Sequence, residues 1–208
     1  MKALVVVDVQ NDFMPGGALA IADGNLIVPV VNKIQDRFDL VVATQDWHPA
    51  GHKSFAANHP GKNPFEQILL RGLPQVLWPV HCVQQTAGAA FHPDLDTRKV
   101  EAIFRKGINP DIDSYSGFYD NGHLKNTGLA GYLRDRGATE VYFCGLAGDI
   151  CVYYSLRDSL KEGFSSYLVE DACRPFNKED FGKAKAQTLE LGGQVVNSAE
   201  IKERMGGK

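Results

Sequence analysis

The sequence predicts an α/β fold, in which a mostly parallel, six-stranded sheet lies between two layers of helices in a three-layer α/β/α arrangement. Six short apolar segments have the composition of strands, and several are unbroken runs of Val, Ile, Leu, Phe and Tyr. Such runs are typical of strands covered on both faces. Helical patterns alternate with these segments, which is the order that produces parallel strands. A chain of 208 residues can bury one substantial core, so we expect a single domain over residues 1–208.

The expected elements follow one another in a regular order. The strands span residues 3–7, 40–44, 100–104, 141–144, 166–169 and 194–196. The helices span residues 26–37, with Pro29 in the first turn, 127–136 and 149–162, which end at Gly137 and Gly163, and 181–191, which follows Asn177 as a candidate cap. The polar tail, residues 200–208, is expected to be frayed.

Two long stretches do not fit this alternation. Residues 46–82 and 108–125 are rich in Gly, Pro, Asn, His and aromatic residues, and each follows an expected strand. They are therefore expected at the carboxyl ends of the sheet, where open α/β proteins bind their ligands. Long irregular loops in a compact domain usually carry function, so the sequence predicts the functional site at this edge.

Charge and composition narrow the range of partners. The chain is 44% apolar and 23% charged, as in ordinary soluble proteins, and its formal net charge of −3 favours neither nucleic acid nor an anionic membrane. No apolar run approaches the length of a membrane span, and Met1 leads directly into a strand without a signal peptide. Four cysteines in a chain this long do not indicate a disulfide framework, so we expect reduced thiols and a cytoplasmic location.

Cys151 lies in the first turn of a helix that leaves the carboxyl end of the strand at 141–144. Unpaired backbone N–H groups and the positive end of the helix dipole collect at such a point. Both favour a thiolate and a developing oxyanion. Position alone leaves two interpretations open, a nucleophile or a small buried hydrophobic side chain.

Two further charged residues follow strands at the same edge. Asp8 ends the first strand, where its carboxylate either caps the next turn or points into the crevice, and the nearby Phe13 could form a wall for a flat ligand. Lys106 stands just past the third strand. It is either a solvated lysine or, beside a carboxylate and a thiol, a cation that stabilises both anions and lowers the thiol pKa.

Three residues have the character of metal ligands. In an extended segment, residues i and i+2 face the same side, so Asp46 and His48 can bind one ion, and His81 can supply a third ligand. Two imidazoles and one carboxylate suit Zn²⁺, Fe²⁺ or Mn²⁺. The alternative is a solvated Asp-x-His pair. We place His52 behind the metal ligands or on the substrate side, and His59 and His92 on the surface.

Six motifs, taken together and in order, resemble one family, the nicotinamidases of the isochorismatase-like, cysteine hydrolase superfamily. The resemblance covers nearly the whole chain, and its fold is Rossmann-like. The motifs are VDVQNDF (residues 7–13), QDWHP (45–49), WPVHC (78–82), FRKG (104–107), SYSGF (114–118) and GLAGDICV (145–152). Each falls at the end of an expected strand or in a long loop.

The resemblance implies a role for each matching residue. Asp8, Lys106 and Cys151 match the catalytic triad, Asp46, His48 and His81 match the metal ligands, and Phe13, Trp78 and Tyr115 match residues that enclose a pyridine ring. It also implies a cis peptide before Ala147, so that the N–H groups of Ala147 and Cys151 form an oxyanion hole. Where this chain has Gly148 the family often has threonine, so we expect a looser loop before the nucleophile.

The implied reaction is the hydrolysis of nicotinamide to nicotinic acid and ammonia through a cysteine thioester, in NAD salvage. One divalent metal ion would serve as cofactor, with Zn²⁺ ranked above Fe²⁺ and Mn²⁺, and pyrazinamide would be a second substrate. The expected partner is a small molecule, and a homo-oligomer is left open. The alternatives are an amidohydrolase for carbamoyl or ureido substrates, an isochorismatase-type hydrolase, a non-catalytic binding module and a structural zinc domain.

Overall fold

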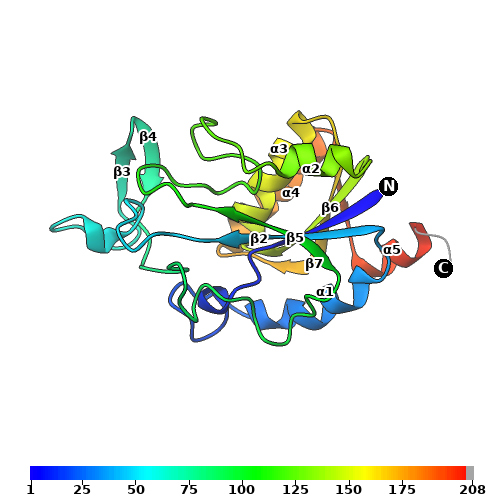
Figure 1. Cartoon of the computed structure of the whole chain (residues 1–208), viewed down its shortest axis with the longest axis horizontal. Coiled ribbons are helices and arrows are strands. Elements are labelled where there is room, and N and C mark those ends of the chain that lie inside the picture. Colours follow the sequence, from blue (N-terminus) through cyan, green and yellow to red (C-terminus); the bar gives the residue numbers. More distant parts are fainter. Residues whose placement is uncertain (205–208) are drawn as a thin grey trace.

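The computed structural model describes residues 1–204 and has the predicted architecture, a parallel six-stranded sheet flanked by helices. The strand order is β5-β2-β1-β6-β7-β8, and every neighbouring pair is parallel. Helices α1 and α5 cover one face of the sheet, and α2, α3 and α4 cover the other (Figure 1). The strands are β1 (Lys2–Val7), β2 (Leu40–Asp46), β5 (Val100–Lys106), β6 (Glu140–Leu146), β7 (Ser165–Arg174) and β8 (Gln194–Val196). The helices are α1 (Val28–Gln35), α2 (Leu129–Asp135), α3 (Tyr153–Lys161), α4 (Lys178–Glu190) and α5 (Ser198–Arg204).

The central strands explain the unbroken apolar runs. All side chains of β1 from Ala3 to Val7 are fully buried, because helices pack on both faces of the strand. The edge strand β5 instead alternates half-buried and exposed residues until Lys106, which is buried. The centre of the sheet is therefore buried and apolar, and its carboxyl edge carries the polar residues.

Several boundaries differ from the sequence prediction. Strands β2 and β5 each continue two residues further than expected, so Asp46 and Lys106 are the last residues of paired strands. The expected helix at 26–37 is divided into a 3-10 turn (Gly24–Ile27) and α1, and the expected helix at 149–162 begins with a π turn (Gly148–Val152) before α3. Asn177 caps α4 as predicted, because its side chain accepts the N–H groups of Glu179 and Asp180.

The prediction of a frayed tail is wrong for residues 200–204. They belong to α5, where Ile201 is fully buried, because this side chain completes the core beneath β7. Residues 205–208 of that prediction lie outside the described residues.

Both long loops lie at the carboxyl ends of the strands, as predicted (Figure 1). The first contains a 3-10 turn (Ala56–Asn58) and an antiparallel hairpin, β3 (Gln67–Leu70) and β4 (Leu73–Val76), neither of which was predicted from the sequence. The hairpin turns at Arg71 and Gly72, which both have positive φ. Two-residue turns of this kind usually contain Asn-Gly or Asp-Gly, so the arginine gave no recognisable turn signal in the sequence. The second loop is held by the Asp120 carboxylate, which accepts the N–H groups of Gly122, Leu124 and Lys125.

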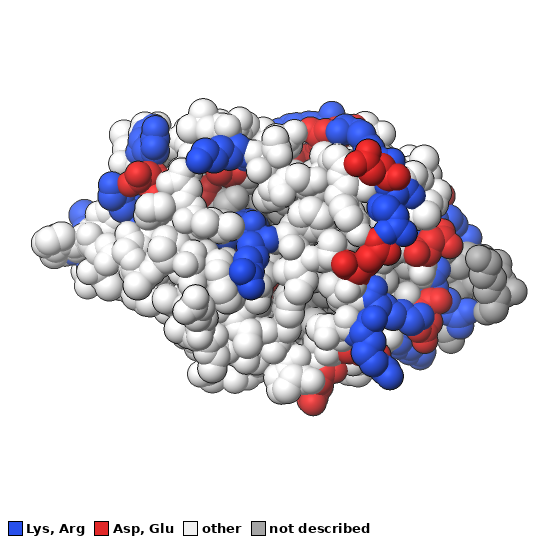
Figure 2. Space-filling model, in the orientation of Figure 1, with Lys and Arg blue, Asp and Glu red and all other residues white. Residues whose placement is uncertain are grey.

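Charges of both signs are interspersed along the upper edge and the right side of the face in Figure 2, and the lower left is largely uncharged.

Within residues 1–204, no helix combines the length and the apolar character needed to cross a membrane.

Candidate active site

Strand register brings four side chains from distant parts of the sequence to one point. Val7 pairs with Thr44 on one side and with Gly145 on the other, so Asp8 emerges between the ends of β2 and β6. On the next strand pair, Asp46 lies opposite Lys106. The turn that follows β6 carries Cys151. The site is therefore built at the carboxyl edge of four adjacent strands.

The Lys106 ammonium group is the centre of this cluster. Its Nζ lies 2.6 Å from Oδ1 of Asp46, 2.9 Å from Oδ2 of Asp8 and 3.3 Å from Sγ of Cys151, and it donates to the Ser114 carbonyl at 3.0 Å. The residue is only 2% exposed. A buried ammonium is costly unless it is paired and hydrogen-bonded, and here two carboxylates and a carbonyl satisfy it. The solvated alternative for Lys106 is excluded.

These contacts set the protonation states. Burial works to lower the pKa of Lys106, but the carboxylates of Asp46 and Asp8 raise it well above its ordinary value. Burial likewise opposes the ionisation of Asp46, yet the charges of Lys106 and His48 hold the pKa of Asp46 well below its usual range. Burial raises the pKa of the Cys151 thiol well above normal, against the attraction of Lys106. The resting site therefore holds a neutral thiol beside an ammonium–carboxylate pair.

The Asp8 side chain contacts Thr44 and Lys106 in the interior and does not cap the turn that follows. Its backbone has φ of 48°, and the Thr44 hydroxyl donates to its Oδ1 at 2.6 Å. Its Oδ2 makes the ion pair with Lys106 but accepts no hydrogen bond of good geometry from any described residue. Burial raises the pKa of Asp8, and the charge of Lys106 opposes this. A carboxylate oxygen of Asp8 lies within 4.8 Å of Sγ of Cys151, so the carboxylate stands close to the thiol.

The turn that carries Cys151 has unusual backbone geometry. The peptide between Leu146 and Ala147 is cis, as the family resemblance implied. The Ala147 carbonyl accepts the N–H groups of both Ile150 and Val152 at 3.1 Å, which closes the π turn around Cys151. Gly145 precedes this turn with φ of 124°, and a Cβ there would lie 2.0 Å from the Val7 carbonyl oxygen. The close approach of β1 to the turn therefore requires glycine at position 145.

The expectation of a looser loop at Gly148 is wrong. The ring of Phe181, from α4, packs on this glycine so closely that a Cβ at position 148 would lie 2.8 Å from Cε2 of the ring. Gly148 is buried in the turn. The aromatic ring thus fills the space of a larger side chain, and α4 supports the turn directly.

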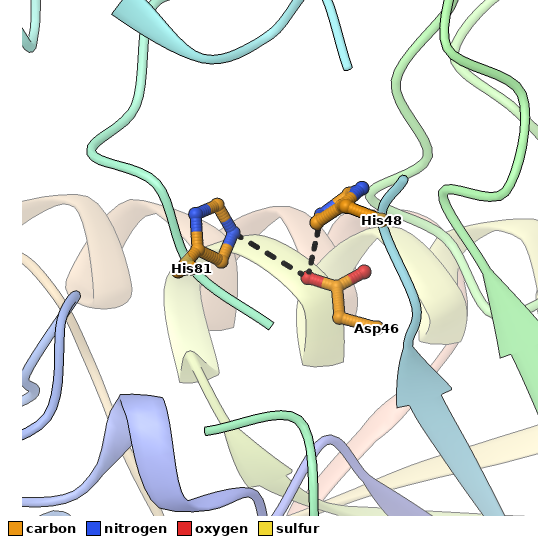
Figure 3. Close-up of side chains that lie close together, drawn as sticks. All are labelled: Asp46, His48 and His81. Atoms are coloured by element: carbon orange, nitrogen blue, oxygen red, sulfur yellow. Dashed lines mark ion pairs between the residues drawn. The ribbon is translucent and has the colours of Figure 1, made fainter. Parts of the chain in front are cut away.

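The three predicted metal ligands converge as Figure 3 shows. Nε2 of His48 lies 3.4 Å from Oδ2 of Asp46, and Nε2 of His81 lies 3.8 Å from the same oxygen. Ligand atoms of all three residues lie within 4.8 Å of one another, and all three side chains are buried. The arrangement places one oxygen and two nitrogens around a common point.

The other ring nitrogen of each histidine is already bound. Nδ1 of His48 donates to the Gly107 carbonyl at 3.0 Å, and Nδ1 of His81 donates to the Pro79 carbonyl at 2.8 Å. Because a carbonyl only accepts, either ring in its neutral form has its lone pair on Nε2, which faces the common point. Gly107 has φ of 67°, and a Cβ there would lie 2.3 Å from the His48 ring. The donor set fits a divalent metal ion.

His52 is buried beside this group. Its ring centroid lies 4.5 Å from that of His48, and its Nδ1 accepts the Ser54 N–H at 3.1 Å. Burial, reinforced by the charge of His48, lowers the pKa of His52 to about 4. With His48 and Asp113 it forms a second group of side chains close enough to share an ion. The two histidines predicted at the surface, His59 and His92, are both partly exposed.

A pocket opens onto the thiol and the metal trio. Its walls include the three predicted aromatic residues Phe13, Trp78 and Tyr115. The Trp78 indole donates to the Tyr115 hydroxyl at 3.3 Å, which fixes the two rings relative to each other. The pocket has further wall residues that the sequence did not predict, namely Leu19, Ile21, Asp113, Ile150 and Phe176.

One of the missed residues carried a signal in the sequence. Phe176 lies two residues beyond the carboxyl end of β7, and the other site residues also lie at or just past the carboxyl ends of strands. Leu19 and Ile21 lie in a short Gly- and Ala-rich segment whose direction depends on packing. No local pattern distinguishes them from ordinary core residues.

Comparison with known proteins decides the family. The model of the isochorismatase domain matches residues 2–200. The chain belongs to the isochorismatase family. It is 48% identical over 200 residues to a nicotinamidase of Acinetobacter baylyi, covering 96% of this chain and 94% of the relative.

Two solved structures extend this similarity to three dimensions. A nicotinamidase/pyrazinamidase of Acinetobacter baumannii has a TM-score of 0.94 at 48% identity, with 96% of this chain and 97% of that chain covered. A pyrazinamidase of Pyrococcus horikoshii in complex with zinc has a TM-score of 0.78 at 39% identity, with 94% and 98% covered. The resemblance to the nicotinamidases is therefore confirmed along nearly the whole chain.

Proposed function

We propose that this chain hydrolyses nicotinamide to nicotinic acid and ammonia through a thioester on Cys151, with one divalent metal ion as cofactor. The observation that carries the proposal is the buried Lys106 ammonium, which contacts both Asp8 and Cys151. This cluster borders an aromatic pocket that also contains the metal trio. Relatives with 48% identity are nicotinamidases, which supports the choice of substrate.

The metal would be held by Oδ2 of Asp46 and by the Nε2 atoms of His48 and His81, the three atoms that converge in the site. When bound, such an ion supplies a Lewis acid that orients a pyridine nitrogen and draws electron density from the ring. We rank Zn²⁺ first, because the P. horikoshii pyrazinamidase was solved with zinc, and Fe²⁺ or Mn²⁺ after it.

Asp8 would act first as a general base. Its carboxylate, which lies close to the thiol, takes the proton of Cys151, and the sulfur attacks the carboxamide carbon. Lys106 would stabilise the thiolate that this transfer produces, because its ammonium contacts both Sγ of Cys151 and the Asp8 carboxyl group. The backbone N–H groups of Ala147 and Cys151 would hold the oxyanion, a contribution of roughly 3–4 kcal/mol per donor.

The same carboxyl group completes both half-reactions. As the C–N bond breaks, Asp8 gives its proton to the leaving nitrogen. Ammonia departs, and the acyl group stays on Cys151 as a thioester. A water molecule then attacks the thioester carbon and gives its proton to Asp8, which passes a proton back to the sulfur. Nicotinic acid leaves, and Cys151 is again a thiol.

The aromatic walls would hold the ring of the substrate between Phe13, Trp78 and Tyr115. Pyrazinamide has a ring of the same shape and the same carboxamide group, so we propose it as a second substrate. The reaction would serve NAD salvage in the cytoplasm, where the four buried thiols stay reduced.

The test is ammonia release from nicotinamide, measured on purified protein, after chelation and after a divalent ion is restored. We expect release that falls on chelation and returns with the ion. Cys151→Ala should abolish release while the protein stays folded, and Cys173→Ala, a matched change of a buried thiol in β7, should retain it. Normal turnover by Cys151→Ala would refute the nucleophile. Absence of release under every metal would favour a carbamoyl or ureido substrate.

A further inference from the structure

We propose that Phe176 is a specificity-determining residue that separates the catalytic pocket from an adjoining groove, and that Asp149 positions it. This inference rests on the proposed function, because it assumes an aromatic carboxamide in the pocket. It predicts a preference for small, unsubstituted rings.

A second depression lies directly beside the catalytic pocket. The two share four wall residues, Trp78, Tyr115, Ile150 and Phe176. Beyond this shared wall, the groove is lined by aromatic side chains such as Phe65 and by polar ones on α4. A ring substituent that passed the wall would find both apolar and hydrogen-bonding surface.

Phe176 is the exposed part of that wall. It is 42% exposed, whereas Trp78 is 7% exposed and is tied to Tyr115 by a hydrogen bond. The Phe176 ring lies 5.9 Å, between centroids, from Trp78 and 5.9 Å from Phe65. Removal of this one ring therefore opens the partition without removing the buried aromatic walls of the pocket.

The Asp149 carboxylate fixes the backbone that carries this ring. One of its oxygens accepts the Phe176 N–H at 2.8 Å, and the other accepts the Asn177 N–H at 2.8 Å. Asn177 in turn caps α4, and Pro175 restricts the backbone just before the ring. The segment is therefore anchored on both sides of Phe176.

Asp149 also belongs to the π turn that carries Cys151. The Asp149 side chain thus links the turn that carries Cys151 to the segment that carries Phe176. Small, flat carboxamides fit within the catalytic pocket. A ring with a bulky substituent on the edge that faces Phe176 clashes with the Phe176 side chain. The class of substrate that the partition excludes is the ring-substituted pyridine carboxamides.

The experiment compares nicotinamide with 5-phenylnicotinamide, by kcat/KM, in the unaltered protein, Phe176→Ala and Phe65→Ala. Phe176→Ala should raise the ratio for the larger substrate by about tenfold to about a hundredfold, the range by which a pocket wall discriminates. Phe65→Ala is the matched control, because Phe65 lines the groove but not the catalytic pocket, and it should leave the ratio unchanged. Equal losses for both substrates in Phe176→Ala would overturn the inference.

Asp149→Asn tests the positioning role. The amide offers only one acceptor oxygen for two N–H groups, so the ratio should rise in the same direction, and KM for nicotinamide should rise more than kcat falls. A fall in kcat with an unchanged ratio would show that Asp149 supports only the nucleophile turn. Phe176→Leu should give an intermediate ratio and keeps the test valid if the alanine variant does not fold.

Failure of the proposed function is recognised separately. If the unaltered protein does not hydrolyse nicotinamide, the same ratio is read from the dissociation constants of nicotinic acid and 5-phenylnicotinic acid, measured by calorimetry. A ratio that shifts in Phe176→Ala but not in Phe65→Ala supports the partition, and a ratio that shifts in neither overturns it.

Discussion

Lys106→Met should destabilise the protein strongly, because it removes the positive charge that pairs two buried carboxylates. Methionine has a similar length and fills most of the space, so lost packing contributes little. The ammonium lies 2.6 Å from Asp46 and 2.9 Å from Asp8, both within the protein interior. Breaking a buried ion pair on one side costs about 3–5 kcal/mol, since the remaining charge loses its partner.

The chain contains a matched control for this substitution. Nζ of Lys185 also lies 2.9 Å from a carboxylate, that of Glu170, but these side chains are 36% and 41% exposed. Lys185→Met should therefore cost at most about 1 kcal/mol. Because the Lys185–Glu170 separation equals the Lys106–Asp8 separation, the difference between the two variants reports mainly on burial and on the second carboxylate at Lys106.

The assay is urea unfolding of both variants in a chelator, with the midpoint and slope fitted together. For a slope of about 2 kcal/mol/M, Lys106→Met should unfold about 2 M earlier than the parent. Because burial raises the pKa of Asp8, the deficit should shrink as the pH falls and Asp8 takes a proton. Equal costs for the two variants, or a deficit that grows on acidification, would refute the reasoning.

The remaining predictions concern the metal and the nucleophile turn. Asp46→Ala and His48→Ala should each lose stoichiometric zinc by elemental analysis, while the partly exposed His59→Ala keeps it; full occupancy in the first two would place the ion elsewhere. Gly148→Thr should cost about 1–3 kcal/mol by overpacking against Phe181, and that cost should largely vanish in a Phe181→Ala background. An undiminished cost in the double variant would show that the ring is not the obstacle.

Much of the site was predictable because its residues stand at strand ends. Asp8 and Lys106 follow apolar runs whose character is local, so parallel pairing brings them to one edge without further information. The i, i+2 spacing of Asp46 and His48 is likewise a local property. The catalytic roles of these residues remain predictions until the variants are measured.

Other features depend on contacts between distant segments and have no local signal. The extension of β2 and β5 by two residues comes from mutual pairing, which one strand alone does not encode. The fit of Phe181 over Gly148 joins α4 to the nucleophile turn, and a glycine in isolation suggests looseness instead. The hairpin at Arg71 was hidden because a left-handed arginine is uncommon in such turns.

The paired register of the sheet has a consequence for folding. Asp8, Asp46, Lys106 and Cys151 come from four adjacent strands that follow a different order in the sheet from their order in the chain. No fragment that lacks one of these strands holds the complete cluster, and the thiol belongs to the last third of the sequence. The complete cluster therefore forms only when all four strands have assembled, and under the proposed function the return of activity after denaturation would report when the last of them has joined.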